Sequence, residues 1–215
     1  MAAFQRIGHG GASAIAPANT LASFDAAREI GIDMVEFDLR AGGGELVLAH
    51  TVFDARRGGN LLLRDALLHF AAKAFSEVAL NVDVKHPGCE SALLEELRRL
   101  NLLARTLVSS QVPAVLDRVR ALEPRARTGI SIGGWIARLS RRWSGWRDPV
   151  LAGLAARRWD ALMAHHRLIG KPLLEEVCSR DAQLYAWTVN KRVTIGQLRS
   201  LGVHGITTAD PRLFA

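Results

Sequence analysis

The chain has 215 residues, of which 49% are hydrophobic and 23% charged, and its formal net charge is +7. This length suits one domain. It lies near the lower end of the range of (β/α)₈ barrels, ~200 to over 400 residues, which excludes a large accessory domain. The positive net charge favours anionic partners, but it does not distinguish among phosphates, nucleic acid and acidic membrane surfaces.

The sequence shows no sign of export or of a membrane span. Its two cysteines, Cys89 and Cys178, have no metal-site or disulfide-framework spacing. The first residues, MAAFQRIGHGG, lack the basic and apolar regions of a signal peptide, and no apolar run reaches the length of a transmembrane helix. We therefore expect a cytoplasmic protein, with peripheral attachment to a membrane as the alternative.

Short apolar runs alternate with helical patterns along the chain. The predicted strands are 4–8, 33–39 with an extension at 45–50, 78–84, 105–109, 126–132, 161–164, 183–188 and 205–207. The predicted helices are 19–30, 61–75, 90–101, 113–122, 148–159, 172–180 and 193–201. Asn19 or Thr20 should cap the first helix, and Asp148, followed by Pro149, should cap the fifth. This alternation predicts an α/β protein whose residues 1–215 form a single (β/α)₈ TIM-type barrel.

Ionisable residues gather at the predicted ends of the first three strands. The set comprises His9, Glu36, Asp38, His50, Asp83 and Lys85. Active sites of such barrels lie at the carboxyl ends of the strands, and residues two apart leave a strand on the same side. Carboxylates bind Mg²⁺ or Ca²⁺, and histidines exchange protons near neutral pH. The set therefore predicts a metal-assisted site with two groups for acid–base catalysis.

Each of these residues also fits a structural role when it is considered alone. His9 precedes two glycines and could be a turn residue, Glu36 and Asp38 could pair with arginines at the rim, and Lys85 could simply pair with Asp83. Their joint position at one face of one barrel favours the functional interpretation.

Four segments resemble one family. They are 6–40, RIGHGGASAIAPANTLASFDAAREIGIDMVEFDLR; 80–85, LNVDVK; 185–190, YAWTVN; and 202–211, GVHGITTADP. Together they resemble glycerophosphodiester phosphodiesterases, part of a superfamily of phospholipase C-like phosphodiesterases. That resemblance implies Glu36, Asp38 and Asp83 as metal ligands, His9 and His50 as the acid/base pair, Lys85 as a phosphate contact, and Trp187 and Asn190 as substrate-binding residues.

The chain departs from the family pattern at several positions. Gly10 replaces an arginine, Ala18 replaces a glutamate, Asp83 replaces a glutamate, and Thr51 replaces the aspartate after the second histidine. The family insertion after that histidine is very short here, at 51–60. Loss of the arginine and the glutamate together would leave neither charge unpaired. The departures bear on phosphate affinity and substrate identity, and they predict an open site.

A segment after the fifth strand, 133–147 (GGWIARLSRRWSGWR), is surplus to the barrel repeat. We predict a helical flap over the barrel mouth, with at least two tryptophans exposed. Trp135, Trp143 and Trp146, with the neighbouring arginines, would make a peripheral membrane contact; a lid or barrel-packing helix is the alternative. His165 and His166 end the sixth strand, should point to opposite sides and are given no role.

These observations predict a phosphoric diester hydrolase that uses Mg²⁺ or Ca²⁺. The expected reaction is hydrolysis of glycerophosphodiesters to glycerol phosphate and an alcohol by histidine acid/base catalysis. Two alternatives remain: a lysophospholipase D-like enzyme acting on lipid phosphodiesters, and a barrel that binds a phosphorylated ligand without turnover. No nucleic-acid partner is expected, because no binding motif accompanies the charge. The sequence leaves open which histidine is the base and which alcohol is released.

Overall fold

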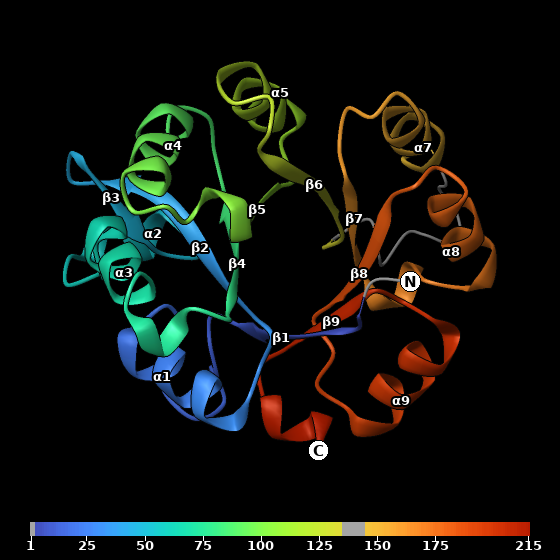
Figure 1. Ribbon diagram of the computed structural model, residues 1–215, viewed down its shortest axis with the longest axis horizontal. Helices are drawn as coiled ribbons and strands as arrows, with labels where there is room; N and C mark the ends of the chain where they lie inside the picture. The colour runs from blue at the N-terminus through green and yellow to red at the C-terminus, as the bar shows by residue number, and fades with distance from the viewer. Residues whose placement is uncertain (1–2, 135–144) are drawn as a thin grey trace.

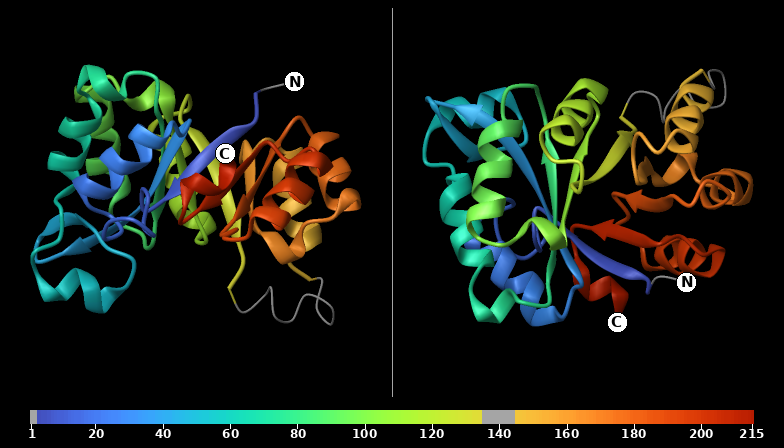
Figure 2. Two further views of the ribbon diagram at one scale, coloured as in Figure 1. Left: turned by 90° about the horizontal axis from the view of Figure 1, so that it is seen from below. Right: turned by 45° about the horizontal axis from the view of Figure 1, so that its top comes forward.

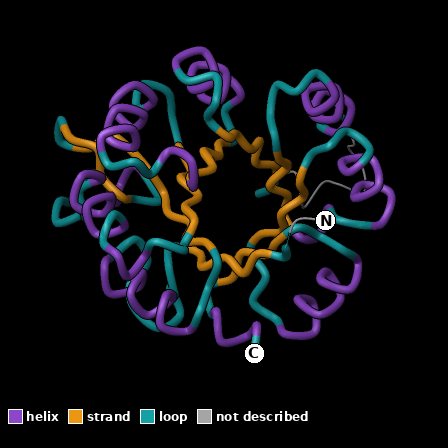
Figure 3. The backbone as a smooth tube through the Cα atoms, viewed as in Figure 1, coloured by secondary structure: helices purple, strands orange, loops and turns teal. Residues whose placement is uncertain are grey.

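A closed ring of parallel strands forms the centre of the protein. The computed structural model describes residues 3–134 and 145–215. Figures 1 and 3 show the strands as a ring with the helices outside it. The strands are β1 (Gln5–His9), β2 (Met34–Gly42), β3 (Glu45–Leu48), β4 (Ala79–Val84), β5 (Thr106–Ser110), β6 (Arg127–Ile132), β7 (Ala161–His165), β8 (Gln183–Trp187) and β9 (Gly205–Thr208). β3 pairs antiparallel with β2, and the remaining strands close the barrel through β1, which lies between β9 and β2.

Helices follow the strands and cover the outside of the ring, as expected for a (β/α)₈ barrel. The α-helices are α1 (Leu21–Ile30), α2 (Val52–Arg57), α3 (Leu63–Phe70), α4 (Glu90–Arg99), α5 (Pro113–Leu122), α7 (Arg147–Ala155), α8 (Lys171–Cys178) and α9 (Arg192–Leu201). The 3₁₀ helices are η1 (Lys73–Phe75), η2 (Leu103–Arg105), η3 (His166–Leu168) and η4 (Pro211–Phe214). Among the described helices, none has both the length and the apolar character needed to cross a membrane. The predicted TIM-type barrel is confirmed.

The hydrophobic core has an outer and an inner part. The larger part fills the space between strands and helices, where Phe24, Phe37 and Phe70 pack against one another with ring centroids 4.8 to 5.9 Å apart. A smaller part plugs the barrel interior and includes Ile7 and Tyr185, among others. The inner plug leaves the carboxyl end of the barrel open for a pocket.

Local signals explain where the first elements start and stop. The Thr20 side chain accepts a hydrogen bond from the Ser23 amide and caps α1, and Gly31 ends the helix in a left-handed conformation. The β2–β3 turn uses Gly43 and Gly44, both with positive φ, which suits a tight hairpin. Figure 2 shows this hairpin and α2 extending beyond one end of the barrel.

Some predicted boundaries were wrong. The predicted helix 61–75 divides into α3 and the 3₁₀ turn η1, and α2 was missed. Asp148 was expected to cap the helix after 147, but α7 begins at Arg147 with Trp146 as its N-cap, so Asp148 lies in the first turn. A carboxylate there still favours the helix because it faces the positive end of the helix dipole.

The predicted lipid contact through the tryptophans of 133–147 needs correction at Trp146. Its side chain is only 8% exposed and packs in the outer core, so it cannot meet a membrane. Packing against the barrel outweighs exposure because burial of an indole removes a large apolar surface from water. Trp135 and Trp143, and with them most of the predicted flap, lie outside the described residues.

Candidate active site

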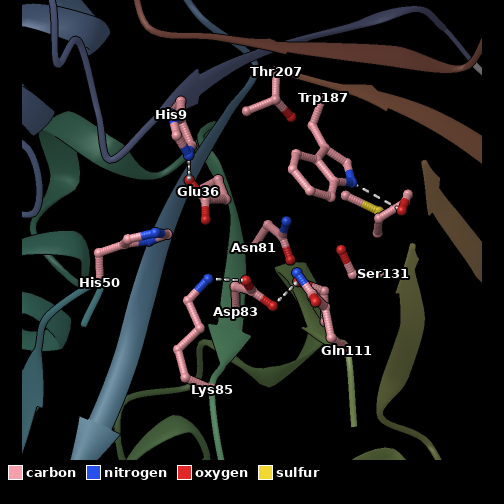
Figure 4. A pocket seen from close by; sticks show the side chains of 12 residues that line it. His9, Glu36, His50, Asn81, Asp83, Lys85, Gln111, Ser131, Trp187 and Thr207 are labelled. Atoms are coloured by element: carbon pink, nitrogen blue, oxygen red, sulfur yellow. Dashed lines mark hydrogen bonds and ion pairs between the residues drawn. The ribbon is translucent and has the colours of Figure 1, made fainter. Parts of the chain in front are cut away.

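A pocket opens at the carboxyl ends of the barrel strands (Figure 4). Its lining residues are His9, Glu36, His50, Asn81, Asp83, Lys85, Ser109, Gln111, Ser131, Met163, Trp187 and Thr207. In Figure 4 the two histidines and Lys85 stand on one side, and Gln111, Ser131 and Trp187 stand opposite them. The pocket therefore has an ionisable wall from the first part of the chain and a largely uncharged wall from the remainder.

Three buried carboxylates converge beside this pocket, and two of them, Glu36 and Asp83, line it. Glu36, Asp38 and Asp83 each offer an oxygen within 4.8 Å of the other two, and each side chain is nearly inaccessible to solvent. Parallel pairing of β2 with β4 produces this arrangement, since Asp38 and Asp83 are partners in register. Glu36 lies two residues earlier on β2 and so shares their side of the sheet. The structure thus brings together the three residues that the sequence analysis selected as metal ligands.

Backbone and amide groups orient these carboxylates. The Gly10 N–H donates to Oε2 of Glu36 at 3.0 Å, and Asn19 Nδ2 donates to Oδ2 of Asp38 at 3.0 Å. Asn19 Oδ1 also accepts from the Asp38 N–H at 3.1 Å, so this asparagine holds both the side chain and the backbone of the aspartate. Ser109 Oγ donates to Oδ1 of Asp83 at 3.2 Å. Asn19 was expected to be a helix cap at most; its bracing role was missed.

The two departures Gly10 and Ala18 are neighbours in space. Gly10 has φ of +55°, and a Cβ added there would lie 2.9 Å from the Ala18 Cβ. A side chain at position 10 would therefore collide with the present loop and adopt a backbone conformation that favours glycine. The tight loop directs the Gly10 N–H at Glu36 instead.

Lys85 lies among the carboxylates as an internal counter-charge. Its Nζ lies 2.6 Å from Oδ1 of Asp38 and also forms an ion pair with Asp83. Burial opposes charge on the lysine, but the charges of Asp83, Asp38 and Glu36 outweigh it and raise the pKa of Lys85 above its usual value. The pairing with Asp83 that the sequence left as an alternative is present, together with a second partner in Asp38.

Glu36 and Asp38 experience opposite electrostatic environments. Burial, and next the charge of Asp38, raise the pKa of Glu36 well above its ordinary value. Burial also acts to raise the pKa of Asp38, but hydrogen bonding to His50 and the charge of Lys85 outweigh it and lower the pKa. Three carboxylates that face one lysine leave an excess of negative charge in the cluster. Oxygen donors in this arrangement fit a hard divalent cation such as Mg²⁺ or Ca²⁺.

The two histidines flank the cluster in different surroundings. His9 Nε2 lies 3.8 Å from Oε2 of Glu36, and burial lowers the pKa of this imidazole. His50 Nδ1 lies 3.3 Å from Oδ2 of Asp38, and this contact raises the pKa of the more exposed ring. Both rings reach the pocket, as predicted from the sequence, so two proton-exchanging groups lie beside one carboxylate cluster.

The two residues predicted to bind substrate, Trp187 and Asn190, lie in different positions relative to the pocket. Trp187 lines the pocket, and its Nε1 donates to the Met163 carbonyl at 2.9 Å, which fixes the indole against the wall. Asn190 does not reach the pocket; its Oδ1 accepts from the Ala209 N–H at 2.9 Å and from the Thr208 hydroxyl at 3.1 Å. Asn190 therefore secures the end of β9, and its role as a substrate-binding residue stays a prediction.

His165 and His166 do not point to opposite sides as predicted. Their rings stack with centroids 4.4 Å apart, because the chain leaves the extended conformation at β7 and enters η3. Neither ring lines the pocket.

Several pocket residues were not anticipated from the sequence. They are Asn81, Ser109, Gln111, Ser131, Met163 and Thr207. Asn81 carried a readable signal, because it lies two residues before Asp83 on β4 and therefore faces the same side. The others required knowledge of how later strands close the barrel.

Comparisons with known proteins agree with this site. Residues 9–53 match the model of the glycerophosphoryl diester phosphodiesterase family. A glycerophosphodiester phosphodiesterase of Caldanaerobacter subterraneus subsp. tengcongensis is 24% identical, with 95% of this chain and 93% of that protein covered.

Two solved structures share the fold. A glycerophosphodiester phosphodiesterase from Parabacteroides distasonis is 18% identical with a TM-score of 0.79, covering 97% of this chain and 94% of that one. An Oleispira antarctica phosphodiesterase, solved with the product sn-glycerol-3-phosphate, is 22% identical with a TM-score of 0.77, covering 97% of this chain and 94% of that one. The family match covers the first histidine and the β2 carboxylates, and the chain is thus similar to glycerophosphodiester phosphodiesterases, which are phosphoric diester hydrolases.

Proposed function

We propose that the protein hydrolyses glycerophosphodiesters to glycerol phosphate and an alcohol, with a divalent cation and with His9 and His50 as acid and base. The observation that carries this proposal is the convergence of Glu36, Asp38 and Asp83 between these two histidines. A barrel that only binds its ligand would need no pair of proton-exchanging groups beside the carboxylates. Their retention favours turnover over a purely binding role.

In this mechanism each group of the pocket has a chemical task. Glu36, Asp38 and Asp83 would hold the cation, which supplies charge neutralisation to the phosphodiester as negative charge develops. One histidine takes the proton of the attacking hydroxyl, and the other gives a proton to the departing alcohol oxygen. The attacking hydroxyl would be the one on the glycerol carbon next to the phosphodiester, and water would open the resulting cyclic phosphate.

Lys85 lines the same pocket as the two histidines. Its raised pKa keeps the ammonium charged, so it can donate to a non-bridging phosphate oxygen when it leaves one of its carboxylate partners. Asn19 and Ser109 keep Asp38 and Asp83 in place during this exchange.

A lysophospholipase D-like activity remains the second candidate because of α2. The helix starts just after His50, and Phe53 on it is 74% exposed. An exposed phenylalanine next to a catalytic histidine suits a substrate with an acyl chain or a lipid surface. Peripheral contact with a membrane would belong to this second activity.

The test is hydrolysis by the purified protein after removal of bound metal. Glycerophosphocholine, glycerophosphoethanolamine and 1-acyl lysophosphatidylcholine are supplied with Mg²⁺, with Ca²⁺ or with neither. The phosphomonoester product is measured, which is glycerol phosphate from the first two substrates and lysophosphatidic acid from the third. We expect cation-dependent hydrolysis, reduced about 10²–10⁴-fold by His9→Ala and by His50→Ala.

His69→Ala is the matched control, because His69 pairs with Asp25 through a 2.9 Å contact outside the pocket. It should keep normal turnover. Near-normal rates for both pocket variants, or no hydrolysis of any diester with either cation, would contradict the proposal.

A further inference from the structure

The β2–β3 hairpin carries His50 and lies outside the closed ring of strands. Among the described strands, β3 pairs with β2 alone, and Figure 1 shows it at the outer edge of the barrel. His50 comes shortly after the end of β3, and its side chain is 64% exposed. Asp38, by contrast, lies on the part of β2 that pairs with β4 inside the ring. The contact between His50 and Asp38 therefore joins a peripheral element to the barrel, and it depends on how the hairpin is held.

His86 extends the connection between β2 and β4 beyond the end of their backbone ladder. The paired register ends at Leu39 and Val84, and the last backbone bond runs from the Lys85 N–H to the Leu39 carbonyl at 3.1 Å. Two residues farther along β2, the Ala41 N–H donates to Nε2 of His86 at 2.9 Å. A side chain of the loop between β4 and α4 thus takes the place that a backbone carbonyl would take if β4 continued in register.

The surroundings of the His86 ring fix its orientation. Nε2 accepts from a backbone N–H and so carries no hydrogen, whereas Nδ1 lies 2.8 Å from the Pro87 carbonyl and donates to it. Sγ of Cys89, which is buried in the outer core, lies 3.9 Å from Nε2 and 4.0 Å from Nδ1 and packs against the ring. The imidazole is therefore a neutral acceptor in a fixed position, which is what an amide at the end of a backbone ladder requires.

Arg40 connects this anchored part of β2 to His50. Its Nε donates to the His50 carbonyl at 3.0 Å. Arg40 directly precedes Ala41, so the bond from Ala41 to His86 also holds the backbone position from which the arginine reaches across the hairpin. The connection therefore runs from the loop after β4, through two residues of β2, to the backbone of His50.

We propose that His86 is a positioning residue: it holds the β2–β3 hairpin so that the His50 imidazole stays beside Asp38. This inference rests on the proposed function, because it concerns how the same site keeps one of its two proton-exchanging groups in place. His86 is not among the described residues that line the pocket, so it acts through the hairpin and not on the substrate. Loss of its bond should loosen the hairpin and leave the pocket residues on the ring strands in place.

Amide hydrogen exchange and steady-state kinetics test the structural and the catalytic effect separately. In His86→Ala the Ala41 amide should exchange at least about fivefold faster than in the wild type, because its hydrogen bond is lost, while the amides of the ring strands keep their rates. With glycerophosphocholine and saturating cation, kcat should fall at least about tenfold and KM should stay within about twofold, because a displaced acid or base slows the chemical step without removing contacts that bind the substrate.

Two further variants assign these effects to the hydrogen bonds of the hairpin. His86→Gln should restore both the slow exchange at Ala41 and the high kcat, because its side-chain carbonyl oxygen can accept from the Ala41 N–H. Arg40→Met removes the bond to the His50 carbonyl and should lower kcat with KM unchanged. This second variant keeps the test decisive if His86→Ala does not fold.

His204→Ala is the matched control. Nδ1 of His204 also accepts from a backbone N–H, that of Leu184 at 3.1 Å, but it does so near the amino ends of β8 and β9. The control should change neither the exchange at Ala41 nor kcat.

Unchanged exchange at Ala41 in His86→Ala, or faster exchange there with an unchanged kcat, overturns the positioning role and leaves the phosphodiesterase function standing. A glutamine variant with a kcat as low as that of the alanine variant overturns it as well. Hydrolysis of no diester by the wild type removes the proposed function and this inference with it.

Discussion

The ammonium of Lys85 lies 2.6 Å from Oδ1 of Asp38 and also pairs with Asp83, so one lysine contacts two of the three clustered carboxylates. Both aspartates belong to the group of three carboxylates that could hold a divalent cation. Two positive charges a few ångströms apart repel. A bound cation and the Lys85 ammonium therefore compete for the carboxylates of this cluster. Binding of a cation is expected to move the ammonium toward the open pocket, where a phosphate oxygen would meet it.

Replacement of Lys85 by methionine separates the effect of this lysine on cation affinity from its effect on turnover. Lys85→Met should raise the affinity for Mg²⁺ at least about tenfold, because the repulsion is gone, and should lower hydrolysis because a phosphate donor is lost. Calorimetric titration gives the affinity and a product assay gives the turnover. The exposed Lys171→Met is the control, and it should change neither quantity. An unchanged affinity in Lys85→Met would show that lysine and cation do not compete.

Cation binding should also stabilise the folded protein. At a free concentration 100 times the dissociation constant, the stabilisation is about 2.7 kcal/mol. For a chain of this length, each kcal/mol shifts the melting temperature by about 2–4 °C, so the total rise is about 5–11 °C. Asp83→Asn should abolish this rise, whereas the exposed Asp65→Asn should keep it. A melting temperature that responds equally in both variants would place the cation elsewhere.

The pair of Arg6 and Asp33 predicts a pH-dependent part of the stability. The Arg6 backbone N–H, Nε and Nη2 donate to the Asp33 carboxylate at 2.8, 2.9 and 2.8 Å. Burial alone would raise the pKa of Asp33, but these hydrogen bonds outweigh it and lower the pKa. A lowered pKa means stability that is fully present above the unfolded-state value, about 3.9, and that is lost as pH falls through the folded-state value.

Asp33→Asn tests that dependence. Urea unfolding should show the variant less stable than wild type at pH 7 and at pH 5, with the difference shrinking at pH 3.5 and below. The exposed Asp65→Asn gives the background effect of removing one carboxylate. A difference between Asp33→Asn and wild type that stays constant over this range would contradict the assignment.

Trp146 should contribute to stability and not to lipid binding. Its indole is 8% exposed in the outer core, so Trp146→Ala should cost about 3–5 kcal/mol in the free energy of unfolding. Phe53→Ala, at a side chain 74% exposed, should change it by no more than about 0.5 kcal/mol. Denaturant unfolding measures both. Loss of anionic-vesicle binding in Trp146→Ala, with stability unchanged, would reverse this conclusion.

The sequence predicted the barrel and the converging residues because both depend on simple periodicities. Parallel strands end at one face, and residues two apart on a strand point the same way, which sufficed to place Glu36, Asp38 and Asp83 together. Their roles as ligands stay predictions. Contacts between distant segments could not be anticipated. The hydrogen bond between Asn190 and the Ala209 N–H joins two loops, and α2 was missed because Thr51 caps a helix too short to show a period.

The proposed reacting groups and the opposite wall of the pocket come from separate parts of the chain. Every residue proposed for metal binding or proton transfer lies at or before Lys85, whereas the wall that faces them runs from Ser109 to Thr207. The junction between β4 and β5 therefore separates the part of the chain that carries the proposed reacting groups from the part that forms the facing wall. Chimaeras joined there, with later strands from a phosphodiesterase of similar fold, would alter which substrate is accepted while the same bond is broken.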